Sequence, residues 1–171
     1  MENVREEERD WLVTESVGEE EINQELADCS NYIGTFAIDE ILNIKIKEYP
    51  VCFVLNLDER KNSGTHWIAL YMYSHSIYIC DSLGGLNPSD DFPSELIIFL
   101  NIMAYQKHFF ITKQLQCLTS PTCGYYCILF VKLMCENNFQ LFQSLFTNDC
   151  LENDKNIKNI LQKHLMLQHI K

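Results

Sequence analysis

The sequence contains no stretch of about 18 uncharged apolar residues, so we expect no part of the chain to span a bilayer. Residues 1–8 lack the basic and then apolar order of a signal peptide, which argues against secretion. None of the eight cysteines has the Cys-x-x-Cys spacing that is typical of zinc sites, so we predict no metal site. We therefore expect the cysteines to be reduced in an intracellular compartment and mostly to act as small buried hydrophobic residues.

Positive charge is also scarce, because 13 Lys and Arg stand against 24 Asp and Glu. No basic stripe is present, so the sequence gives little support to nucleic-acid binding. The acidity is concentrated at the start, where residues 1–28 hold 11 acidic residues and two arginines. We interpret residues 1–19 as a solvated acidic N-terminal arm. The alternatives are a segment that attracts a basic partner and a mobile flap.

Residues 20–171 are long enough for one compact domain, and the chain is 47% apolar. Periodicity predicts helices at residues 20–28, 36–43, 93–105, 124–135, 139–146 and 155–169. It predicts strands at residues 51–57, 66–73, 76–81 and 109–112, of which 66–73 and 76–81 form an antiparallel hairpin. The helix at 124–135 is so apolar that it must be buried on most faces. Strands in the middle with helices on both sides indicate an α+β fold.

The hairpin is expected to bring His66 close to Asp81. A turn near Ser74 and His75 pairs residues whose numbers sum to about 148, which places His66 nearly opposite Asp81. A carboxylate on one ring nitrogen fixes the tautomer of a histidine and favours the imidazolium. A slip of the register by one residue would break this contact. Asp81 could instead simply cap the turn that leads to Gly84.

Cys123 stands just before the apolar helix, where the helix dipole and a nearby imidazolium both favour a thiolate. The backbone N–H of Cys123 and the side-chain amide of Gln116 are suited to stabilise an oxyanion. Gly124 removes side-chain bulk where a substrate carbonyl would approach. A single Cys-Gly or His-Trp pair is usually only packing, but the combination predicts Cys123 as nucleophile, His66 as base, Asp81 as its orienting acid and Gln116 in the oxyanion hole.

At these residues the chain resembles the adenovirus endopeptidase (adenain) family, including its relatives in viruses and self-synthesising virus-like transposons. The similar motifs are Gly64-Thr65-His66-Trp67, the spacing from Gln116 to Cys123, the apolar stretch Cys123–Phe130 and the stretch Cys29–Thr35. The resemblance covers about residues 20–137. It implies a papain-like or adenain-like cysteine protease, with a mixed β-sheet flanked by helices and the nucleophile at the N-terminus of a buried helix. It also implies cleavage after Gly, in a cleft to which Gly64, Thr65, Trp67 and Gly124 contribute.

Several features depart from the adenain pattern. Asp81-Ser82-Leu83 is closer to the related ubiquitin-like-protein proteases, which however have a shorter Gln-to-Cys spacing and an Asp where this chain has Thr122. Residues 105–113 contain no cysteine that could bind an activating peptide as in adenain. The acidic chain also lacks the positive charge that suits adenain's DNA cofactor. The sequence therefore requires no cofactor.

We interpret the protein as a viral or virus-like cysteine endopeptidase that cleaves capsid or core precursors during virion maturation. We expect it in the host nucleus or cytoplasm and packaged in the virion, without membrane contact. Two alternatives remain open: a protease that removes ubiquitin-like proteins from host substrates, and a non-catalytic binding module on the same scaffold. Retention of all four catalytic residue types argues against the binding module.

Overall fold

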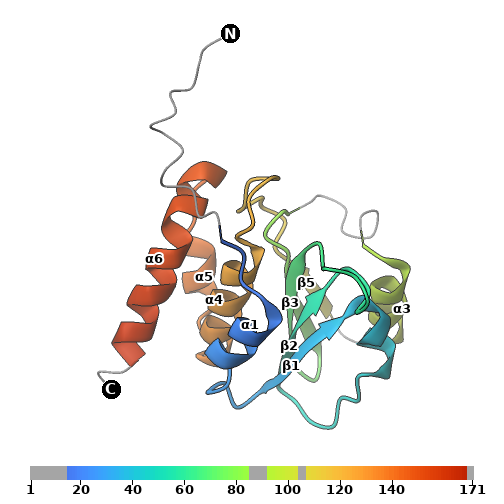
Figure 1. The fold of residues 1–171 in the computed structure, drawn as a ribbon. Helices are drawn as coiled ribbons and strands as arrows, with labels where there is room; N and C mark the ends of the chain where they lie inside the picture. The colour runs from blue at the N-terminus through green and yellow to red at the C-terminus, as the bar shows by residue number, and fades with distance from the viewer. Residues whose placement is uncertain (1–14, 85–91, 104–106, 169–171) are drawn as a thin grey trace.

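The computed structural model describes residues 15–84, 92–103 and 107–168, which form three layers with a β-sheet in the middle (Figure 1). The five strands follow one another across the sheet in the order β1-β2-β3-β4-β5. They are β1 (Tyr32–Ala37), β2 (Val51–Asn56), β3 (Trp67–Met72), β4 (Ser76–Cys80) and β5 (Lys107–Phe110). The helices are α1 (Glu19–Glu25), the 3-10 helix η2 (Ile38–Asn43), α3 (Ser94–Ile102), α4 (Cys123–Cys135), α5 (Phe139–Ser144) and α6 (Cys150–Gln168).

The sheet is mixed, because β1 is parallel to β2 and β5 is parallel to β4, whereas β2, β3 and β4 are antiparallel. All six residues of β2 are buried, as expected for a strand that is covered on both faces. Val54 packs in a core with α1, α4, α5 and α6, whereas Phe53 packs in a second core with η2 and α3. The expected α+β class is therefore observed as a mixed sheet between two layers of helices.

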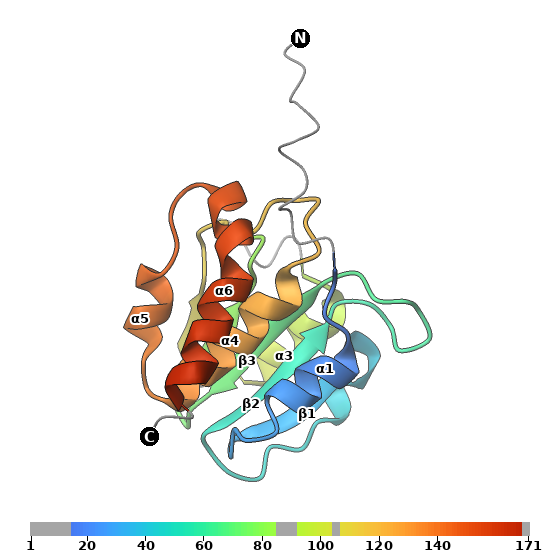
Figure 2. The same cartoon turned by 60° about the vertical axis from the view of Figure 1, so that its left-hand side comes forward.

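Helix α4 lies centrally on one face of the sheet, between α1 and α5, with α6 packed on its outer side (Figure 2). Nearly every residue of α4 is buried, which confirms the prediction of a buried helix. Even Lys132 is only 2% exposed, and its Nζ atom donates to Asp28 Oδ1 at 3.1 Å. Helix α4, whose first residue is Cys123, is thus packed on several sides along its length.

The structure changes several predicted boundaries. Strand β1 was not predicted, and its last two residues fall within the helix predicted at residues 36–43. Helix α6 begins at Cys150 rather than at residue 155. Val17 is only 5% exposed and packs in the core with α4, so the packed part of the chain begins before residue 20. The rest of the predicted acidic arm, residues 1–14, lies outside the described residues, as does the predicted end of the helix at 104–105.

The hairpin register differs from the prediction by one. Strands β3 and β4 pair Ala69 with Cys80, so the numbers of paired residues sum to 149 rather than 148. The cause is a tight turn, in which Tyr73 N donates to Ser76 O at 2.8 Å. An odd sum places residues 66 and 81 on the same face of the hairpin, as diagonal neighbours rather than directly opposed ones.

The expectation that all cysteines are reduced is wrong for one pair. Cys117 and Cys150 form a disulfide with their Cα atoms 5.1 Å apart, although 33 residues separate them in the sequence. The fold causes this pairing, because it places the loop before α4 against the first residue of α6. Cys80 and Cys127 are free and buried, as expected of small hydrophobic residues. Within the described ranges no helix is long and apolar enough to cross a membrane.

Candidate active site

Cys123 is the first residue of α4 and lines a cleft of about 390 Å³. His66, Trp67 and Gln116 line the same cleft. Further parts of the wall come from residues within 16–19, 58–65 and 118–121, which are loops and the start of α1. Cys123 is 9% exposed, so most of this residue is shielded from solvent. The structure therefore brings a thiol, an imidazole and a side-chain amide from distant parts of the sequence to one opening.

His66 immediately precedes β3, and Asp81 immediately follows β4. The Nε2 atom of His66 lies 2.7 Å from Asp81 Oδ1, and their side chains are only 12% and 18% exposed. The same carboxyl oxygen accepts a hydrogen bond from Leu83 N at 3.0 Å. Asp81 thus caps the following turn and contacts the imidazole at once, so the two alternatives considered for this residue are compatible. The turn also holds the carboxyl group in place.

The charge of His66 is governed by its two polar neighbours. Burial alone would lower the pKa of His66, but hydrogen bonds to Asp81 and Cys123, and the charges of these two groups, raise it to about 9. The imidazolium is therefore the main form at neutral pH, and it can pair with a thiolate. By contrast, burial raises the pKa of the Cys80 and Cys127 thiols, which keeps them protonated and unreactive.

Gln116 is only 2% exposed, and several hydrogen bonds fix its position. Its backbone N donates to Ser82 O at 2.9 Å, and its Oε1 atom accepts from Ser82 Oγ at 2.6 Å. Its Nε2 atom donates to the backbone carbonyl of Ser120. The sequence did not single out Ser82 or Ser120, although Ser82 directly follows Asp81. Ser82 thus connects the turn that follows Asp81 with the amide side chain of Gln116.

Gly64 lies in the loop that leads to His66, and its backbone needs a glycine. Its φ is +86°, and an added Cβ atom would lie 2.6 Å from Asn56 Nδ2. Asn56 Oδ1 in turn accepts hydrogen bonds from Thr65 N at 3.2 Å and from Asp58 N at 3.0 Å. Asn56 therefore shapes this cleft wall, and the sequence analysis did not identify it. Gly64, Thr65 and Trp67, the positions predicted to bind substrate, all line the cleft, and their contact with a substrate stays a prediction.

Gly124 does not face the cleft in the way that the sequence suggested. A Cβ atom added there would lie 3.0 Å from Val17 Cβ and 3.6 Å from Ile22 Cδ1. The missing side chain thus allows the segment before α1 to pack closely on α4. The expectation that Gly124 makes room for a substrate carbonyl is replaced by a packing role, because the first turn of α4 faces α1 at this position.

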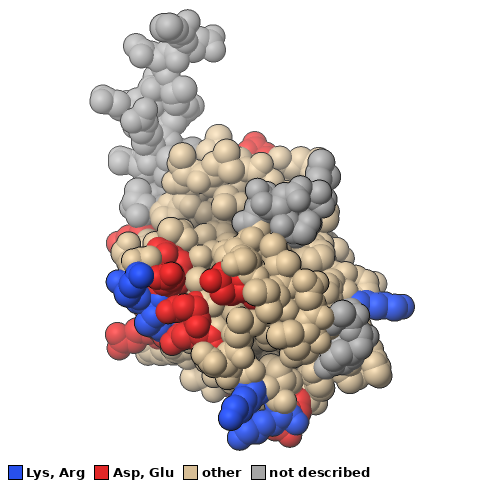
Figure 3. Space-filling model, turned by 90° about the vertical axis from the view of Figure 1, so that its right-hand side faces the viewer, with Lys and Arg blue, Asp and Glu red and all other residues tan. Residues whose placement is uncertain are grey.

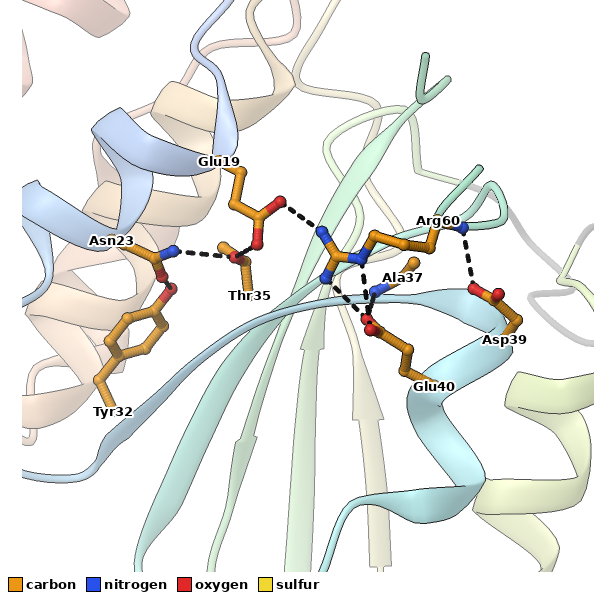
Figure 4. Close-up of polar contacts among 8 residues, drawn as sticks. All are labelled: Glu19, Asn23, Tyr32, Thr35, Ala37, Asp39, Glu40 and Arg60. Atoms are coloured by element: carbon orange, nitrogen blue, oxygen red, sulfur yellow. Dashed lines mark hydrogen bonds and ion pairs between the residues drawn. The ribbon is translucent and has the colours of Figure 1, made fainter. Parts of the chain in front are cut away.

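Arg60 lies in the loop at residues 58–65, which lines the cleft, and its side chain connects this loop to α1 and η2 (Figure 4). Its guanidinium contacts Glu19 and donates to Glu40 Oε2 at 2.7 Å, while its backbone N donates to Asp39 Oδ1 at 2.9 Å. Glu19 Oε1 also accepts from Thr35 Oγ1 at 2.8 Å. Figure 3 shows a gathering of acidic and basic side chains on the surface turned to the right in Figure 1. The side chains of Arg60, Glu19 and Glu40 are 44%, 40% and 38% exposed. Because ion pairs that are this exposed contribute little to stability, we expect these contacts to orient the loop at residues 58–65 more than to stabilise the fold.

No group of three or more metal-ligating side chains is found among residues 15–84, 92–103 and 107–168. The functional groups around Cys123 come from the contacts described above. They are a thiol at a helix start, an imidazolium, a carboxylate that orients it and a neutral amide. Such a set can carry out nucleophilic attack on an acyl group and stabilise the resulting oxyanion.

Comparisons with known proteins identify the fold. Neither a family model nor a curated protein matches the chain. Among solved structures, the chain is similar to the pS273R protease of African swine fever virus, with a TM-score of 0.54 and 16% identity over 80% of this chain and 62% of that chain. The selenomethionine form of the same protease gives a TM-score of 0.54 and 15% identity, over 86% and 68% of the two chains. The chain thus spans less than two thirds of the first structure, with which it shares the fold.

Proposed function

We propose that the protein is a cysteine endopeptidase that cleaves viral or virus-like precursor polypeptides after Gly. One observation carries this proposal: His66, whose ring Nε2 contacts Asp81, lines the same cleft as Cys123 and Gln116. Similarity in fold to a viral protease supports the choice of peptide bonds as substrate. This similarity in fold does not indicate which peptide sequence is cleaved. Cleavage after Gly is inferred from the cleft and from the adenain resemblance.

The reaction would begin with a thiolate of Cys123 attacking the scissile carbonyl carbon. The backbone N–H of Cys123 is one of the first N–H groups of α4, which have no acceptor within the helix. This N–H and the second N–H of Gln116 Nε2 would donate to the oxyanion. The imidazolium of His66 would then protonate the leaving amine, and the C–N bond would break to leave a thioester on Cys123.

Water would complete the cycle. Neutral His66 would take a proton from a water molecule, whose oxygen attacks the thioester carbonyl. The C–S bond would break, and the protein would release a carboxylic acid while Cys123 regains its thiolate and His66 remains protonated. Asp81 would keep the imidazole ring in the orientation that serves both steps. No cofactor takes part in this sequence of steps.

The specificity for Gly would come from the walls of the cleft. Trp67 and the loop around Gly64 stand beside the proposed nucleophile, and Asn56 holds this loop close to the sheet. A substrate side chain next to the scissile bond would have to displace one of these groups. Glycine needs no such space, so short Gly-containing sequences are the expected substrates.

Peptide hydrolysis tests the proposal. The full chain is incubated with a peptide that contains Gly-Gly and with a matched peptide that contains Ala-Ala. We expect cleavage after Gly only in the first peptide, no cleavage by Cys123→Ala, and normal cleavage by Cys29→Ala, which removes another free thiol. Cleavage by Cys123→Ala, or none by the wild type, would contradict the proposal. Intact ubiquitin-like conjugates are tested in parallel, because the motif Asp81-Ser82-Leu83 resembles that of the ubiquitin-like-protein proteases. If these conjugates are cleaved faster than the peptides, the protein is a deconjugating enzyme.

A further inference from the structure

Asp154 is a buried acidic residue that the sequence analysis did not single out. It lies near the start of α6 and is 0% exposed. A carboxyl group is costly to bury unless polar groups surround it, so its partners indicate what it does. Those partners belong to the segment that connects Gln116 with α4 and to α4 itself.

Two hydrogen bonds link Asp154 to this segment, and a third links it to α4. Its Oδ2 atom accepts from Cys117 N at 3.0 Å, and its Oδ1 atom accepts from Thr122 Oγ1 at 2.8 Å. The hydroxyl of Tyr126 donates to Oδ1 at 2.9 Å. Burial, followed by the charge of Asp154, raises the pKa of Tyr126, which therefore remains a hydrogen-bond donor. The donors at 117 and 122 stand immediately after Gln116 and immediately before Cys123.

Two further contacts join the same loop to α6. Asn153 Nδ2 donates to Leu115 O at 3.1 Å, and the disulfide connects Cys117 with Cys150. Residues 115–122 are thus attached to the first turns of α6 at both ends of the loop. Elsewhere the loop contacts Ser82, which leads back to the strand side of the cleft.

We propose that Asp154 is a positioning residue that sets the distance between the amide of Gln116 and the thiol of Cys123. The inference rests on the proposed function, since it names the support of the same oxyanion site. One carboxyl group binds both ends of the loop, so it fixes the distance between these ends. This distance in turn sets the separation of the two oxyanion donors, the side-chain amide of Gln116 and the backbone N–H of Cys123. An apolar side chain would fill this site at a lower desolvation cost, but it would bind neither Cys117 N nor Thr122 Oγ1.

The substitution Asp154→Asn tests the inference because it keeps the size of the side chain but turns one acceptor into a donor. Glu152→Gln, on the exposed side of the same helix turn, makes the same chemical change and serves as the control. Hydrogen exchange, followed by mass spectrometry on the full chain, measures the loop without any need for catalysis. We expect amides in residues 115–122 to exchange about 10-fold faster in Asp154→Asn and unchanged in Glu152→Gln. Unchanged exchange in Asp154→Asn would overturn the inference.

Kinetics test whether the loop acts through Gln116. Asp154→Asn should lower kcat about 10- to 100-fold with little change in KM, as expected when an interaction made only in the transition state is weakened. In a Gln116→Ala background, Asp154→Asn should lower kcat by less than about 2-fold. The reason is that both substitutions remove the same contribution, the stabilisation of the oxyanion by the Gln116 amide. An equal loss in both backgrounds would overturn the inference, since it would indicate a general structural effect.

A second variant covers the case in which Asp154→Asn does not fold. Thr122→Val removes a single donor to Asp154 and leaves the carboxyl group in place, and it should show the same two effects at smaller size. Normal exchange and normal kcat in Thr122→Val would then overturn the inference. If the wild type cleaves no peptide, the proposed function fails, while the exchange experiment still decides whether Asp154 holds the loop.

Discussion

The Nε2 atom of His66 lies 2.7 Å from Oδ1 of Asp81, although each residue stands just outside its strand. The pair is diagonal in the hairpin, and the turn that contains Leu83 holds the carboxyl group toward the ring. The geometry therefore depends on two local features, the tight turn between β3 and β4 and the cap after β4. Both can be altered by single substitutions.

Asp81→Asn should lower kcat by about 10²–10⁴-fold, because an amide cannot stabilise the imidazolium as a carboxylate does. The side chain keeps its size and can still accept a hydrogen bond from Leu83 N. The variant should therefore remain folded, with a moderately lower melting temperature because the imidazolium loses a charged partner, and circular dichroism during heating provides this control. Full activity of the variant in peptide hydrolysis would remove Asp81 from the proposed mechanism.

The pH dependence follows from the raised pKa of His66. Its pKa is about 9 in the folded chain against an ordinary value of 6.5, so folding favours the imidazolium. Its contribution to stability is fully present below pH 6.5 and is lost as the pH rises through about 9. Proton transfer to the leaving amine needs the same form, so kcat should fall above pH 9.

NMR titration of the His66 ring and hydrolysis rates at each pH measure these two effects. In Asp81→Asn the alkaline fall should move to lower pH, because one of the groups that raise the pKa is gone. An alkaline limit that is the same in both proteins would contradict the assignment of this limit to His66.

Gln116→Ala should lower kcat by about 10²–10³-fold, the usual effect of removing one oxyanion donor. Ser82→Ala should have the same sign but a smaller effect, about 10-fold, because it only removes the hydrogen bond that orients Gln116 Oε1. Neither substitution should raise KM strongly. Steady-state kinetics with one Gly-Gly peptide measures both, and a larger loss for Ser82→Ala than for Gln116→Ala would contradict this order of roles.

Gly64→Ala should reduce the free energy of unfolding by about 1–3 kcal/mol, because φ is positive and the new methyl group meets Asn56. Gly18→Ala is the matched control, since a Cβ atom there has nothing within 4 Å. Its cost should stay below about 1 kcal/mol, the scale of a changed helix cap. Urea unfolding of both variants measures the difference, and equal costs would show that the loop relaxes freely.

Local patterns in the sequence pointed to His66, Gln116 and Cys123, which line one cleft, but they missed Asn56 in its wall and wrongly included Gly124. The apolar stretch after Cys123 and the turn between residues 73 and 76 are both short-range signals, and they locate the thiol and the imidazole–carboxylate contact. The predicted sum of paired residue numbers in the hairpin was too low by one. This sum depends on a two-residue turn whose backbone geometry cannot be deduced from composition. The contact forms because the observed sum of 149 places residues 66 and 81 on one face of the hairpin, whereas the predicted sum of 148 would have placed them on opposite faces.

Long-range contacts could not be predicted in the same way. Asp154 binds residues 32 and 37 positions earlier, and Cys150 pairs with Cys117 across 33 positions. No local pattern marks these residues, since a charged residue in an amphipathic helix is usually solvated. Gly124 was misread for a related reason: the sequence indicates that space is needed, but only the packing of Val17 shows what occupies it.

The central claim is that His66 activates Cys123, and site-resolved alkylation tests it most directly. The full chain is treated briefly with iodoacetamide at pH 6 to 7, and mass spectrometry measures the labelling of each cysteine. The account predicts that Cys123 reacts fastest although it is only 9% exposed, and that His66→Ala slows it to the rate of the other free thiols. Equal labelling of Cys123 and the more exposed Cys29, unaffected by His66→Ala, would contradict it.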